Sequence, residues 1–70
     1  MFNFTSISHR NGWNYQTDFS GKREHDAVEQ FEKWCSSHDV EWGHLFYQET
    51  GVGVRSYFKG AGLVDFEGCP

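Results

Sequence analysis

The chain has no long apolar run and little that would anchor or export it. No stretch of about 18 or more consecutive apolar residues occurs among its 70 residues, so the sequence predicts no transmembrane helix and no membrane partner. The N-terminus, MFNFTSISHRNG, lacks the charged segment and apolar block that form a secretory signal. We therefore expect one cytoplasmic domain spanning residues 1–70.

Cysteine is also scarce. With two cysteines, and in a compartment that keeps thiols reduced, we expect Cys35 and Cys69 to stay free, a Cys35–Cys69 bridge being the alternative. Together with His38 and His44 these thiols could form a four-ligand zinc set, but structural zinc usually takes two close pairs. Only Cys35 and His38 are closely spaced. We assign no metal ligand and no cofactor, and a small zinc-stabilised interaction module remains an alternative.

Catalytic and phosphate-binding motifs are missing as well. Neither Gly51-Val52-Gly53 nor Gly60-Ala61-Gly62 precedes a predicted helix, so neither has the form of a phosphate loop. Cys35 lies near the end of a predicted helix, where the helix dipole disfavours a thiolate. The sequence therefore predicts no catalytic residue and a protein that is not an enzyme.

Basic charge is sparse and acidic charge is concentrated. Six Lys and Arg stand against ten Asp and Glu, for a net charge of −4. The basic footprint of a nucleic-acid-binding protein is therefore absent, and we do not expect direct nucleic-acid binding. The segment 24–41 holds six of the acids and only Lys33, a net charge of −5, whereas the rest of the chain sums to +1. This asymmetry indicates association with a partner rather than a particular fold.

Aromatic residues are abundant. They make up 19% of the chain, whereas aliphatic side chains are few. A domain of this size buries only about 60% of the surface of its unfolded chain. Aromatic side chains bury roughly 150–250 Å² each, so this composition suits a small sheet covered by one helix.

Asn11-Gly12 predicts a first hairpin, because both positions of a type I′ turn need positive φ. This turn places Arg10 opposite Trp13, Ser8 opposite Tyr15 and Phe4 opposite Phe19. One face then carries five aromatic residues: Phe2, Phe4, Trp13, Tyr15 and Phe19. The other face is polar except for Ile7, which supports this register.

A helix is predicted over residues 22–37, with Ser20 as its N-cap. The apolar positions Ala27, Val28, Phe31, Trp34, Cys35 and His38 follow a 3.6-residue period.

A second hairpin is predicted from residues 40–49 and 52–59 around Thr50-Gly51. A two-residue turn places Leu45 opposite Ser56 and Tyr47 opposite Val54. One face would then carry Leu45, Tyr47, Val52, Val54 and Phe58. The other would carry Trp42, His44, Phe46, Gln48, Arg55, Tyr57 and Lys59. A one-residue slip would mix these two sets.

The resulting fold class is α+β. We expect two layers in the order ββαββ(β), an antiparallel sheet with one helix packed on one face, and residues 63–66 as an optional fifth strand. One helix cannot cover both faces of such a sheet, so one face stays open.

The partner-binding residues that we select come from the acidic helix face and the mixed sheet face. Carboxylates could meet a basic surface, and aromatic and arginine side chains often dominate interfaces. The predicted set is Asp26, Glu29, Glu32, Trp42, Arg55 and Tyr57.

The layout and the helix DAVEQFEKW resemble those of small phage-encoded inhibitors, namely anti-CRISPR proteins and inhibitors of host RNA polymerase. This resemblance implies a stoichiometric inhibitor that binds a larger, nucleic-acid-handling protein with a basic surface, in the host cytoplasm if the chain is phage-encoded. One alternative is a module that binds single-stranded nucleic acid through an aromatic and basic sheet face. A homodimer formed through the uncovered sheet face is also an alternative.

Overall fold

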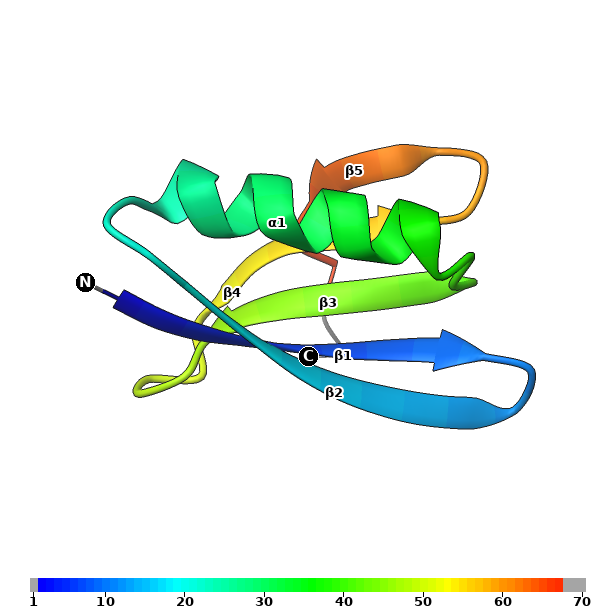
Figure 1. Cartoon of the computed structure of the whole chain (residues 1–70), viewed down its shortest axis with the longest axis horizontal. Coiled ribbons are helices and arrows are strands. Elements are labelled where there is room, and N and C mark those ends of the chain that lie inside the picture. Colours follow the sequence, from blue (N-terminus) through cyan, green and yellow to red (C-terminus); the bar gives the residue numbers. More distant parts are fainter. Residues whose placement is uncertain (1, 68–70) are drawn as a thin grey trace.

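The computed structural model describes residues 2–67, which form five strands and one helix (Figure 1). The elements, in chain order, are β1 (Phe2–Arg10), β2 (Trp13–Gly21), α1 (Glu24–Ser37), β3 (Trp42–Tyr47), β4 (Gly53–Phe58) and β5 (Gly62–Asp65). The predicted α+β class and element order are confirmed, and the C-terminal segment does add a fifth strand. Within residues 2–67, no helix is long and apolar enough to cross a membrane.

All five strands belong to one antiparallel sheet with the order β2-β1-β3-β4-β5. The helix connects β2 to β3 and packs against one face, where it contacts β1, β2, β3 and β4 (Figure 1). We call this side of the sheet the helix face. The described part of the chain has no helix on the other face, as expected for a two-layer fold.

The first hairpin has the predicted turn and register. Asn11 and Gly12 both have positive φ, 52° and 81°, which is the requirement of a type I′ turn. Arg10 pairs with Trp13, and pairing continues without a shift to Phe2 and Gly21. Phe4 is buried on the helix face, so the alternation read from the sequence correctly identified the inward side.

The helix begins later than predicted. Ser20 is not the N-cap, because it belongs to β2, which continues to Gly21. The N-cap is Arg23, and its backbone N–H donates to Oδ2 of Asp26 over 3.2 Å. A Cβ on Gly21 would lie 2.8 Å from Cβ of Asp26. Glycine therefore lets the chain turn tightly from the strand into the helix.

The core lies between α1 and the middle strands. Its buried apolar residues are Phe4, Ala27, Phe31, Cys35, Val40, Leu45 and Val54. The predicted helix stripe supplies Ala27, Phe31 and Cys35. Burial raises the pKa of the Cys35 thiol to about 12, so this group is neutral and packs as a small apolar side chain. Cys35 forms no disulfide within the described residues; Cys69, and hence the alternative Cys35–Cys69 bridge, lies outside them.

The predicted register of the second hairpin is wrong at every paired position of β3 and β4. Leu45 pairs with Arg55 and Phe46 with Gly53, so Val54 is an extra residue in β4. This is a β-bulge, which moves one strand by one residue relative to its partner. The turn also involves more than Thr50-Gly51, because β3 ends at Tyr47 and β4 begins at Gly53. Arg55 and Tyr57 consequently lie on the helix face, and Ser56 and Phe58 lie on the opposite face.

Phe31 provides a test of the core. Its ring is fully buried against the sheet, so Phe31→Ala should lower the free energy of unfolding by about 3–5 kcal/mol. Glu32→Ala, at the exposed next position of the same helix, should change it by less than about 0.5 kcal/mol. Urea unfolding followed by tryptophan fluorescence measures both values. Equal effects of the two substitutions would contradict the assigned core.

Candidate partner-binding surfaces

The six predicted partner-binding residues do not form one surface. Asp26, Glu29 and Glu32 lie on α1, as expected. Trp42 lies on the sheet face opposite the helix, because it pairs with His9 and Phe58. Arg55 and Tyr57 lie on the helix face, opposite Leu45 and Gly43. The expected grouping of Trp42, Arg55 and Tyr57 is therefore wrong, and the β4 bulge is the reason.

Several acids of the acidic segment have partners within the fold. Asp26 accepts the Arg23 N–H and lies 3.3 Å from Nε2 of His25. Glu24 accepts a hydrogen bond from the Tyr47 hydroxyl at 2.9 Å, and this contact is the main reason why the pKa of Tyr47 is raised. Asp39 pairs with Lys59 at 3.0 Å. These acids therefore help to hold local structure.

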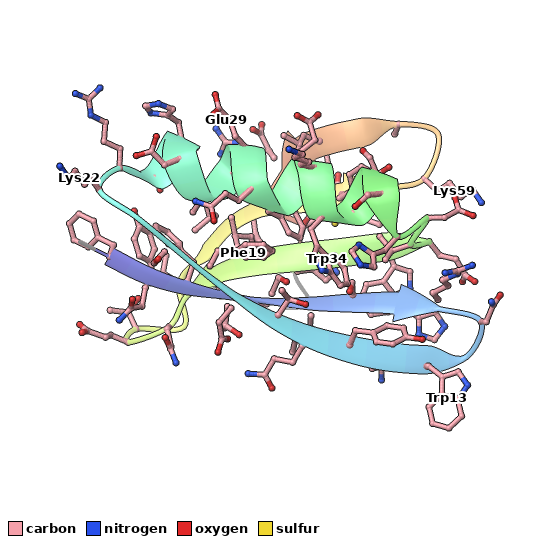
Figure 2. The ribbon with its side chains drawn as sticks, viewed as in Figure 1. Trp13, Phe19, Lys22, Glu29, Trp34 and Lys59 are labelled. Carbon is pink, nitrogen blue, oxygen red and sulfur yellow. The ribbon has the colours of Figure 1, made fainter. Side chains whose placement is uncertain are left out.

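Glu29 and Glu32 differ from the other helix acids. Both are exposed, and neither forms an ion pair with another residue in the range 2–67. The spacing of Glu29 and Lys33 suits a helical pair, but no such ion pair forms. Figure 2 shows Glu29 on the side of α1 that points away from the sheet. These two carboxylates are therefore the part of the predicted acidic site that is available to a partner.

Aromatic rings gather on the sheet face opposite the helix. We call this set the aromatic face; its residues are His9, Trp42, His44, Phe46, Phe58 and Phe66. All six are partly buried. The His9 and Trp42 rings are stacked with centroids 5.2 Å apart and an interplanar angle of 1°. Phe66 follows β5 and packs edge-on against Phe46 and His44.

His44 is at the centre of the aromatic face. Its ring is 5.3 to 6.5 Å from the rings of Trp42, Phe46, Phe58 and Phe66. Nδ1 of His44 lies 2.8 Å from the Ser56 hydroxyl oxygen, which also accepts the backbone N–H of Glu67 at 2.8 Å. Burial lowers the pKa of His44, and the Glu67 carboxylate partly offsets this effect. The neutral imidazole is therefore favoured in the folded protein.

The aromatic face lacks the basic side chains expected of a surface that binds single-stranded nucleic acid. Arg55 lies on the helix face, and Lys59 pairs with Asp39 beyond the end of β4. No lysine or arginine of residues 2–67 belongs to the aromatic face as defined above. Stacking groups are present, but the basic residues of the five described strands, Arg10 and Arg55, both lie on the helix face, away from these rings.

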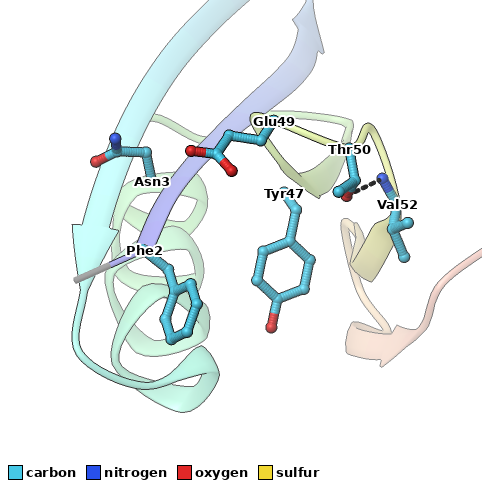
Figure 3. A pocket seen from close by; sticks show the side chains of 6 residues that line it. All are labelled: Phe2, Asn3, Tyr47, Glu49, Thr50 and Val52. Atoms are coloured by element: carbon cyan, nitrogen blue, oxygen red, sulfur yellow. Dashed lines mark hydrogen bonds between the residues drawn. The ribbon is translucent and has the colours of Figure 1, made fainter.

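A pocket of about 400 Å³ lies where β1 begins and β3 ends (Figure 3). It is lined by Phe2, Asn3, Tyr47, Glu49, Thr50 and Val52. The Phe2 and Tyr47 rings meet edge to face, with centroids 6.2 Å apart. Glu49 is one of the lining residues. The Tyr47 hydroxyl donates a hydrogen bond to Glu24, which lies in the first turn of α1. Aromatic walls beside carboxylates suit a cationic side chain.

The residues considered for zinc are dispersed. Cys35 is a buried residue of α1, whereas His44 lies on the opposite face of the sheet. The His38 ring stacks on Trp34 at 4.3 Å. Across residues 2–67, no three His, Cys, Asp or Glu side chains are grouped as metal ligands. Cys69 lies outside the described residues.

The pocket was missed in the sequence because its parts come from three segments. Phe2 begins the chain's first strand, and Tyr47 and Val52 flank the second turn. The one signal in the sequence was Val52, an apolar residue beside the predicted turn. In the structure the Val52 side chain is 57% exposed.

Comparisons of the chain with protein-family models, curated proteins and solved structures found no match. The surfaces described above are therefore the basis for the function proposed below.

The lowered pKa of His44 predicts a pH dependence of stability. The unfolded chain binds a proton at His44 more readily than the folded chain does, so stability falls as pH drops below about 6.5, the ordinary histidine value. We expect His44→Gln to lose less stability than the wild type between pH 7 and pH 5. Urea midpoints across this range measure the difference, and parallel curves for the two proteins would contradict it.

Proposed function

We propose that the protein is a non-enzymatic binding protein that occludes the basic surface of a larger partner. The observation that carries this proposal is the exposure of Glu29 and Glu32 on the outer side of α1 without ion pairs inside residues 2–67. Charges placed in this way favour encounter with an oppositely charged surface and guide its orientation. Asp26 adds to the negative charge on this helix, but it also stabilises the helix start.

The pocket beside Tyr47 adds an anchoring position. Its walls include aromatic and aliphatic side chains, the Glu49 carboxylate is part of the lining, and Glu24 accepts the hydrogen bond of the Tyr47 hydroxyl. A lysine or arginine stem could pack on the rings while its charge meets these carboxylates. The pocket and the outer face of α1 would then recognise the same kind of partner.

Nucleic-acid-handling machinery is the partner class that we propose. Proteins that hold DNA or RNA expose lysine- and arginine-rich channels that neutralise phosphates. An acidic chain can occupy such a channel in place of nucleic acid. The resemblance of the layout and of the helix DAVEQFEKW to phage-encoded inhibitors, including anti-CRISPR proteins, supports this choice.

Charge reversal on the helix tests the proposal. Wild-type protein fixed to a resin should retain a protein from bacterial lysate at about one copy per chain, and mass spectrometry identifies it. Glu29→Lys/Glu32→Lys should weaken retention at least about tenfold, because like charges would then face each other. Asp26 is left unchanged, since its replacement would also disturb the helix start.

The matched control is Asp65→Lys/Glu67→Lys, which makes the same change in net charge at β5 and just after it, away from α1. It should retain the partner nearly as well as the wild type. The proposal fails if the wild type retains nothing, or if the helix variant and the control behave alike.

A basic peptide tests the pocket separately. Titration of hexa-arginine should shift the NMR signals of Phe2, Tyr47 and Val52, which line the cavity. Glu49→Gln should weaken binding about two- to fivefold, the usual range for an exposed charge pair. Asp65→Asn removes the same charge from β5 and serves as the control. Equal affinity of these two variants would argue against a cation site in the pocket.

A further inference from the structure

β2 is a long sheet edge with nothing paired to its outer side in the described structure. It has nine residues, and β1 is the one strand of the described sheet that pairs with it. Arg10 and Trp13 close a two-residue turn, so they form a hydrogen-bonded pair, and such pairs recur at every second position. The backbone N–H and C=O groups of Asn14, Gln16, Asp18 and Ser20 therefore point to the outside.

One of these four edge positions is already occupied. Nε2 of Gln30 donates to the Ser20 carbonyl at 2.8 Å. This bond shows independently that the Ser20 backbone faces outward. It also closes the end of the edge that lies beside the helix, and it leaves the stretch from Asn14 to Asp18 open.

The edge lacks most of the features that usually prevent strand addition. Such features are prolines, charged side chains, bulges and very short strands, and β2 has one of them, the Asp18 carboxylate. β2 contains no proline, lysine or arginine, and its nine pairs with β1 show no bulge. The opposite edge, β5, has only four residues.

Large side chains are exposed along the same strand. Trp13 is 71% exposed and Tyr15 is 43% exposed. Figure 2 shows Trp13 at the end of β2, directed away from the body of the protein. Side chains of this kind gain most when a neighbouring strand covers them.

We propose that two copies of the chain pair through β2, antiparallel, with Gln16 on the two-fold axis. The open stretch from Asn14 to Asp18 is centred on Gln16, so this register uses every outward-facing group that Gln30 leaves available. Asn14 of each copy then lies opposite Asp18 of the other, where the amide can donate to the carboxylate. On the helix face, Trp13 meets Phe19 and Tyr15 meets Thr17.

The neighbouring symmetric registers fit less well. An axis at Asp18 would place two carboxylates opposite each other, which is unfavourable. An axis at Thr17 would pair Asn14 with Ser20, whose carbonyl is held by Gln30.

With Gln16 on the axis, the two sheets become continuous, both helices lie on one side, and both aromatic faces lie on the other. The dimer would therefore present each partner-binding surface twice.

Sedimentation and light scattering test the pairing. The wild type should have twice the 8.2 kDa chain mass, whereas Gln16→Lys and Gln16→Glu should each run as monomers, because like charges face each other at the axis. An equimolar mixture of these two variants should restore the dimer. Gln48→Lys, an exposed change away from β2, should stay dimeric.

Gln16→Cys, in a Cys69→Ser background, tests the register. In this register the two Gln16 residues form a hydrogen-bonded pair, whose Cα atoms lie about 5.5 Å apart, a distance that a disulfide spans. Mild oxidation should give a covalent dimer, and Gln48→Cys in the same background should not. Circular dichroism confirms that each variant is folded. A monomeric wild type, a dimeric Gln16→Lys, or equal cross-linking of the two cysteine variants would overturn the proposal.

Discussion

The contact between Phe31 and Gly43 determines how the two layers of this protein meet. A Cβ at Gly43 would lie 3.3 Å from two carbons of the Phe31 ring and 3.4 Å from Sγ of Cys35. The ring therefore rests on the backbone of β3, and the neighbouring positions of β1 are also small, Ser6 and Ser8. Because side chains alternate along a strand, Gly43 faces the helix while its neighbours Trp42 and His44 face the other side of the sheet. The aromatic face is thus the other half of the pattern that brings the helix close to the sheet.

The first hairpin and the helix stripe could be predicted because local rules determine them. Asn11-Gly12 fixes one turn type, and that turn fixes every pair from Arg10–Trp13 to Phe2–Gly21. Ala27, Phe31 and Cys35 repeat at helical spacing and are all buried. The exact helix start could not be predicted, because Ser20 is a good N-cap by type but remains paired in β2.

The second hairpin shows where such rules stop. Both of its faces carry aromatic residues, so the hydrophobic pattern does not select between two registers that differ by one residue. Val54 is an inward-facing extra residue that is buried in the same core as Leu45 and the helix residues, so its place depends on contacts from other segments. The predicted binding set failed at this point, since Arg55 and Tyr57 changed sides whereas Trp42 and the helix acids did not. The pocket beside Tyr47 depends on the same turn and could not be read from any one segment.

The bulge at Val54 also bears on how this surface could evolve. Loss of the Val54 codon would remove the extra residue and leave the pairs on either side of it, Leu45 with Arg55 and Phe46 with Gly53, directly adjacent. Arg55 and Tyr57 would therefore stay on the helix face, and Ser56 and Phe58 would stay on the other. What the deletion would remove is a buried apolar side chain. The extra residue thus lets the core under the helix change while the chemistry of the open face is preserved.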